Sequence, residues 1–106
     1  MTSAATAFRA PRTFSTVGLP DQRRIELWER HNAAALIGLT CHTTGGSPLE
    51  ATELNVELEK VHLARVAGSA HTVQRNTSVI RESPADAIAV YLTLRGDAWF
   101  EHSGGT

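Results

Sequence analysis

The sequence predicts a mostly β, α+β domain in which one N-terminal amphipathic helix packs on a largely antiparallel β-barrel or sandwich. Apolar residues recur at helical spacing over residues 21–36, and five or six short strands with tight connections follow this helix. The strongest single signal is the stretch 87–102, in which a segment of period-two alternation is followed by a glycine turn and by a second segment that can pair back. Together these observations favour a sheet-rich domain with one helix across it.

The helix is expected to begin near Pro20, which suits a first helical position, and Asp21 is placed well in the first turn. Trp28 falls on the apolar stripe of this helix, whereas charged residues cover the other face. We therefore expect Trp28 to anchor the helix on the sheet, because an indole buries a large area. Gly38 is expected to end the helix.

Strands are expected over residues 39–43, 52–58, 61–67 and 70–75, with a two-residue hairpin turn at residues 59–60. Two sets of residues alternate along the strand at 52–58. The apolar set, predicted to face the core, is Leu54, Val56 and Leu58, and the polar set, predicted to face water, is Glu53, Asn55 and Glu57. Residues 76–82 are expected to form either a turn of helix or a loop that ends at Pro84.

The final hairpin is predicted from residues 88–95 and 98–102. One face of its first strand is apolar and carries Ile88, Val90, Leu92 and Leu94. Gly96 supplies the positive φ of a tight turn, and the second strand carries Trp99 and Phe100. Because the chain then stops as if another strand should follow, we expect it to be part of a larger sheet.

Charge and composition exclude several classes of function. Ten basic and eleven acidic residues are mixed along the 106-residue chain, so nothing favours binding of nucleic acid or of a membrane surface by this chain. No stretch is apolar enough to span a membrane. The lone cysteine, Cys41, excludes an internal disulfide and is typical of a reducing cytoplasm. Residues 1–13 have no sustained period and are expected to form a flexible leader.

Three groups of residues carry a resemblance to a known family. They are Phe14-Ser15-Thr16 with Leu19-Pro20 and the helix of Trp28; residues 61–66 (VHLARV) with residues 71–75 (HTVQR); and residues 91–96 (YLTLRG). In this order and spacing, they resemble the N-terminal ligand-binding-like domain of AraC-type transcriptional regulators, a cupin-like barrel. The resemblance covers residues 14–106.

This resemblance implies a non-enzymatic, effector-sensing and dimerising domain that takes part in transcription regulation, binds a small-molecule effector and uses no cofactor. Residues 14–106 would be the front part of that domain, an incomplete barrel. The later strands and the helix-turn-helix DNA-binding domain of the family are absent from the sequence. The resemblance therefore assigns DNA binding to the complete type of regulator and not to this chain.

An effector pocket inside such a barrel needs apolar walls and a polar end. Tyr91, Trp99 and Phe100 are the candidates for the walls, and Arg65, His71 and Arg75 are the candidates for the polar end. Ordinary core packing is the alternative role of each aromatic residue. Arg75 has a second alternative role, in which it holds the following turn through hydrogen bonds.

Catalysis and metal binding are not expected. The five histidines are scattered over different elements, and no His-x-His with a nearby Glu occurs, so no metal site is predicted. Cys41 and His42 are neighbours on a strand, so their side chains point to opposite faces and cannot act as a nucleophile and its base.

Two other hypotheses remain open. One is a small cupin-like metal protein, and the other is a stand-alone interaction domain that pairs with a full-length regulator through exposed strand edges. An unfinished barrel also predicts marginal stability or self-association, because the strands at its open edge lose part of their burial.

Overall fold

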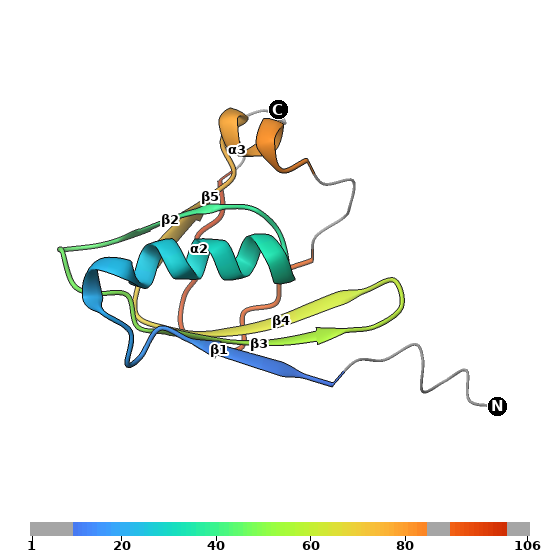
Figure 1. Ribbon diagram of the computed structural model, residues 1–106, viewed down its shortest axis with the longest axis horizontal. Coiled ribbons are helices and arrows are strands. Elements are labelled where there is room, and N and C mark those ends of the chain that lie inside the picture. Colours follow the sequence, from blue (N-terminus) through green and yellow to red (C-terminus); the bar gives the residue numbers. More distant parts are fainter. Residues whose placement is uncertain (1–9, 85–89, 102–106) are drawn as a thin grey trace.

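The computed structural model describes residues 10–84 and 90–101. In this part of the chain, five strands form two antiparallel sheets, and one main helix contacts both of them (Figure 1). The first sheet has the order β1 (Arg12–Ser15), β3 (Ala51–Glu57), β4 (His62–Gly68), and the second pairs β2 (Thr40–Thr43) with β5 (His71–Gln74). The mostly β, α+β prediction is confirmed at this level, but the described strands do not close into a barrel.

The predicted helix is present as α2 (Arg24–Ala35), which follows a single 3-10 turn, η1 (Asp21–Arg23). Trp28 is buried at the centre of the core, as predicted, and the residues around it come from several elements. The other buried core residues are Cys41, Leu49 and Ala51, and the partly buried residues packed against them are Phe14, Ile25 and Leu39. The helix is therefore held by the indole that its apolar stripe presents.

The four strands predicted between residues 39 and 75 are confirmed as β2, β3, β4 and β5, with boundaries that differ by at most one residue. The tight hairpin between β3 and β4 is also present, and its turn is closed by a hydrogen bond from Leu58 N to Val61 O at 2.8 Å. Residues 76–82, for which a helix or a loop was expected, contain a short helix, α3 (Thr77–Glu82). The Asn76 side chain caps this helix by accepting a hydrogen bond from Val79 N at 2.9 Å.

The first correction concerns the predicted leader. β1 begins at Arg12, so the last two residues of the segment 1–13 belong to the three-stranded sheet, whereas residues 1–9 lie outside the described part of the chain. Arg12 pairs with Asn55, and Thr13 pairs with Leu54. A four-residue strand is too short to show the period-two alternation of apolar and polar residues. β1 is held extended by its hydrogen bonds to the edge of β3.

The second correction concerns the faces of β3. Glu53 and Asn55 are buried beneath α2, whereas Leu54 and Val56, which were predicted to face the core, are only half-buried. The small residue Ala51 lies on the same face as Glu53 and belongs to the core around Trp28. Packing of the helix over this face, and not the polarity of the strand, decides which side chains are covered.

The third correction concerns the final hairpin. Residues 90–101 form no regular strand, and apolar side chains along them are exposed, with Val90 88% and Trp99 91% accessible. Gly96 has the positive φ that the turn requires, at +80°. The rest of the predicted hairpin, residues 87–89 and 102, lies outside the described ranges. Alternation alone does not make a strand, because an extended segment also needs a hydrogen-bonded neighbour.

Neither α2 nor α3 has the length and apolar character that a bilayer-spanning helix requires, and this holds for every helix among the described residues.

Candidate functional site

A groove of about 520 Å³ runs along the end of β5, between this strand and the segment that carries Trp99. Its lining is mostly polar. The lining residues are Thr72, Val73, Gln74, Arg75, Asn76, Trp99 and Glu101. The structure therefore brings together two of the six predicted ligand residues, Arg75 and Trp99, although they lie more than twenty positions apart in the sequence.

Arg75 has a structural role within this groove. Its guanidinium donates one hydrogen bond to Gly38 O and another, at 2.7 Å, to Ser83 O. It thus ties the end of β5 to the loop after α2 and to the residue after α3. The alternative role predicted for Arg75 was to hold the turn that directly follows it. The hydrogen bonds run instead to Gly38 O and to Ser83 O, at the far end of α3.

The other four predicted ligand residues lie elsewhere. Arg65 is exposed on β4 and pairs in register with Leu54, so it shares the sheet face turned away from Glu53. His71 donates from Nδ1 to Ser69 O at 2.7 Å and meets the Trp28 ring edge-on at 6.3 Å between centroids. Its contacts therefore place it beside the core.

Tyr91 and Phe100 form a pair of their own. Their ring centroids are 5.1 Å apart, and both side chains are exposed. Neither ring lines the groove along β5. The structure thus separates the three aromatic candidates into one groove residue and one exposed pair.

A second polar site, the α2–β3 cluster, consists of His31, Glu53 and Asn55. His31 Nε2 donates to Asn55 Oδ1 at 2.7 Å, and Asn55 Nδ2 donates to Glu53 Oε2 at 2.7 Å. His31 Nε2 also lies 3.6 Å from Glu53 Oε2. Glu53 has no accessible surface, and its second oxygen, Oε1, is buried without a hydrogen-bond partner among the described residues. The cluster therefore holds an acceptor that the described chain does not satisfy.

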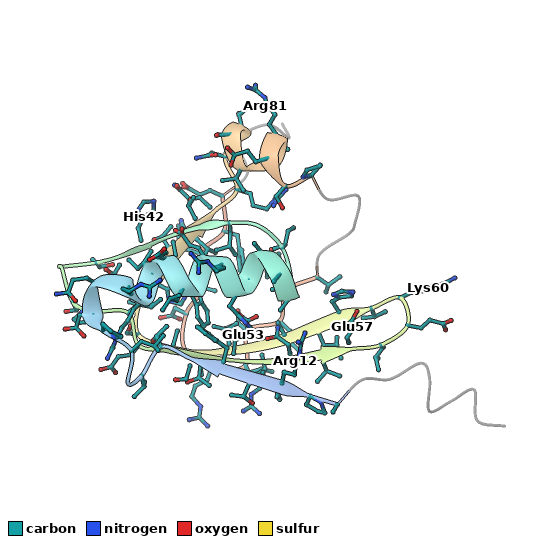
Figure 2. All side chains as sticks on the ribbon, in the orientation of Figure 1. Arg12, His42, Glu53, Glu57, Lys60 and Arg81 are labelled. Carbon is teal, nitrogen blue, oxygen red and sulfur yellow. The ribbon has the colours of Figure 1, made fainter. Side chains whose placement is uncertain are left out.

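The surroundings of the α2–β3 cluster are aromatic on one side. The Phe14 ring stacks on the His31 imidazole at 4.5 Å between centroids and 9° between planes, and it also contacts Trp28 at 6.1 Å. Figure 2 shows Glu53 between α2 and the three-stranded sheet, whereas Lys60 projects from the tip of the β3–β4 hairpin. The polar groups of the cluster thus sit in a partly apolar environment that strengthens their interactions.

Sequence reasoning missed this cluster because it assigned Glu53 and Asn55 to the solvent face of the strand. The available signal was the alternation itself, which correctly placed both residues on one face of β3. What the sequence lacked was the position of His31, which reaches this face from a different element.

Cys41 is not equipped to act as a nucleophile. Its side chain is buried, and burial, followed by the nearby Glu29 carboxylate, raises the pKa of the Cys41 thiol to about 11. The Glu29 Oε2 atom accepts a hydrogen bond from Cys41 N at 2.8 Å. His42 is exposed, so the two neighbours do point to opposite sides of β2.

Comparisons with protein-family models, with curated proteins and with solved structures find no match for this chain.

Proposed function

We propose that this chain is a non-enzymatic, effector-sensing regulatory module of the AraC type, which works in the cytoplasm. The groove along β5 is the observation that carries the proposal. The guanidinium of Arg75, which is fixed by hydrogen bonds, and the exposed indole of Trp99 both line this groove. One helix followed by antiparallel strands with tight connections further supports an incomplete cupin-like barrel. In this proposal DNA binding belongs to the helix-turn-helix domain of the complete type of regulator and not to residues 1–106.

The groove favours a small polar effector with a flat apolar face. Trp99 offers an exposed ring for stacking, and Gln74, Asn76 and Glu101 offer amide and carboxylate groups for hydrogen bonds. Arg75 spends part of its donor capacity on Gly38 O and Ser83 O. It therefore fixes the shape of the groove as much as it offers charge to a ligand.

The test is a thermal-shift screen of the full chain against small aromatic acids, sugars and nucleosides, followed by tryptophan fluorescence for each ligand found. Trp28 is buried and Trp99 is exposed, so a groove ligand should change the accessible part of the emission. Trp99→Ala should weaken binding by at least about tenfold, the loss of about 1.4 kcal/mol of stacking. Tyr91→Ala removes an exposed ring outside the groove and is the matched control.

Two results would count against effector binding in this groove. The first is a screen in which no compound stabilises the chain. The second is a ligand whose affinity falls equally in Trp99→Ala and Tyr91→Ala, because such a ligand would not distinguish the groove from the exposed aromatic pair.

A second candidate function is protein pairing, and the edge strand β4 favours it. Every residue of β4 is exposed, and its outer edge has no strand neighbour among the described residues. Leu63 and Val66 on this strand are about half accessible. Such an edge offers both backbone hydrogen bonds and apolar contact to another chain. We propose a regulator with a complete domain of the same type as its partner.

Sedimentation of the chain alone, and of the chain mixed with such a regulator, tests this pairing. Leu63→Lys should weaken complex formation, because a charged side chain beside an edge opposes strand addition. Val17→Lys changes an exposed apolar residue outside β4, 64% accessible against 50% for Leu63, and should have no effect. Self-association of the isolated chain would identify a second copy as the partner. A monomer that binds no regulator would refute the pairing function.

A further inference from the structure

The buried carboxylate of Glu53 poses a physical problem that the described chain does not solve. Its Oε2 atom accepts one hydrogen bond from Asn55 Nδ2, while Oε1 is buried without a partner. An ionised carboxylate that is removed from water costs several kcal/mol unless charge or hydrogen bonds compensate it. Among the residues that the structure describes, the group that forms an ion-pair contact with Glu53 is the imidazole of His31, with Nε2 at 3.6 Å from Oε2. A group that brings positive charge to Glu53 would therefore be stabilised there.

The donor atoms of the α2–β3 cluster have a spacing that suits one ion. Ligand atoms at about 2.0 to 2.2 Å from a tetrahedral ion lie about 3.3 to 3.6 Å from one another. His31 Nε2 and Glu53 Oε2 are 3.6 Å apart, so an ion between them requires little movement. Asn55 Oδ1 is the third oxygen or nitrogen donor of the cluster. It lies at hydrogen-bond distance, 2.7 Å from His31 Nε2, so it must move away by roughly 0.6 Å to reach the ligand spacing.

We propose that the α2–β3 cluster binds one divalent first-row metal ion, for which Zn²⁺ is the probe. An imidazole nitrogen with carboxylate and amide oxygens is a donor set that such ions accept. On binding, the ring hydrogen of His31 moves from Nε2 to Nδ1 by exchange with water, so the imidazole stays neutral and the lone pair of Nε2 coordinates the ion. Asn55 Oδ1 thereby loses its donor and becomes available as a ligand.

The unpartnered Oε1 atom of Glu53 fits this proposal, because a carboxylate can offer both oxygens to an ion. Among the described residues, no three His, Cys, Asp or Glu side chains converge. The third protein ligand must then be the amide oxygen of Asn55, and water must complete the coordination. Such a site has fewer and weaker protein ligands than a structural zinc site with four thiolate or imidazole ligands. The inference does not depend on the proposed effector groove.

The chain provides a matched control in the same three-stranded sheet, between Glu57 on β3 and His62 on β4. His62 Nε2 lies 3.7 Å from Glu57 Oε2, nearly the distance found in the cluster, but these side chains are 51% and 37% accessible. This pair is solvated, whereas Glu53 is fully buried. If the proposal is right, ion binding follows the buried pair and not the exposed one.

The experiment titrates the full chain with Zn²⁺ by calorimetry and with Co²⁺ by visible absorption, at neutral pH. We expect one ion per chain and the Co²⁺ spectrum of a low-coordinate nitrogen and oxygen site. His31→Gln and Glu53→Gln should each weaken Zn²⁺ binding by more than about tenfold, the lower limit seen even for outer partners of metal ligands. His62→Gln should leave the affinity unchanged.

Paramagnetic broadening provides a measurement that needs no variant. Mn²⁺ or Co²⁺ added to the wild-type chain should broaden the amide resonances around His31 and Glu53 more than those around His62. The proposal is overturned if the wild-type chain binds no Zn²⁺, as expected when Oε1 is met by an ordered water only. It is also overturned if His62→Gln abolishes binding while His31→Gln does not.

Discussion

Asn55 donates its Nδ2 hydrogen to Glu53 Oε2 at 2.7 Å, so two residues on the same face of β3 hold each other beneath α2. The amide of Asn55 is oriented by this bond, and its oxygen then accepts the hydrogen of His31 Nε2. One side chain thus connects a buried carboxylate on the sheet to an imidazole on the helix. This amide adds a polar link between α2 and β3 to the packing of Trp28 in the core.

The first prediction follows from that connection. Asn55→Ala leaves Glu53 without its donor and His31 without its acceptor, so we expect a loss of about 1 to 3 kcal/mol in the free energy of unfolding. Urea denaturation in metal-free buffer measures this loss. Glu50→Ala, at an exposed position directly before β3, should change stability by less than about 0.5 kcal/mol. Equal effects of the two substitutions would show that the amide is not a key contact.

A second prediction concerns Thr16, which has no accessible surface. Its Oγ1 atom donates to Leu49 O at 2.7 Å and accepts from Ala51 N at 3.0 Å, so it joins the end of β1 to the start of β3. Thr16→Val keeps the volume but removes both bonds, and we expect a loss of about 1 to 3 kcal/mol. Thermal denaturation should show little change for the control Thr13→Val, whose side chain is exposed.

A third prediction follows from the pKa of Cys41, which is raised from 9.0 to about 11. Because the folded state favours the neutral thiol, the contribution of Cys41 to the free energy of unfolding is complete below about pH 9. This contribution is lost as the pH rises towards 11. Cys41 should therefore react with a disulfide reagent at pH 8 only as fast as the chain unfolds. Urea should accelerate the reaction strongly. Immediate reaction of the folded chain would contradict the observed burial.

The sequence was sufficient to predict those elements that are determined by their own pattern of apolar and polar residues. Trp28 marks the covered stripe of α2, and the hairpin between β3 and β4 follows from two alternating segments with a short connection. It was not sufficient to choose the buried face of β3. Period-two alternation defines two faces, but which face α2 covers is decided by contacts such as those of Phe14 and His31, which lie on other elements.

The candidate site illustrates the same limit. Arg75 and Trp99 could be selected because guanidinium and indole groups are common in binding sites, yet their meeting in one groove is a property of the fold. Tyr91 and Val90 carried the strongest strand pattern, but no described strand pairs with their segment. A sequence pattern does not reveal whether a hydrogen-bonding neighbour is present, and strand formation depends on that neighbour.

The last prediction separates the structural role of Arg75 from ligand binding. Its forked guanidinium reaches Gly38 O and Ser83 O together, which the single ammonium of a lysine cannot reproduce with the same geometry. In Arg75→Lys, without any ligand, we expect the amide hydrogens of Ile80 and Ser83 in and after α3 to exchange about tenfold faster, a loss of about 1.4 kcal/mol of local stability. Arg81→Lys is the matched control, because Arg81 is exposed on α3. Amide exchange in β3 should be the same in both variants. If the two variants accelerate exchange in α3 equally, the guanidinium of Arg75 does not hold this helix in place, and its position in the groove is then better explained by contact with an effector.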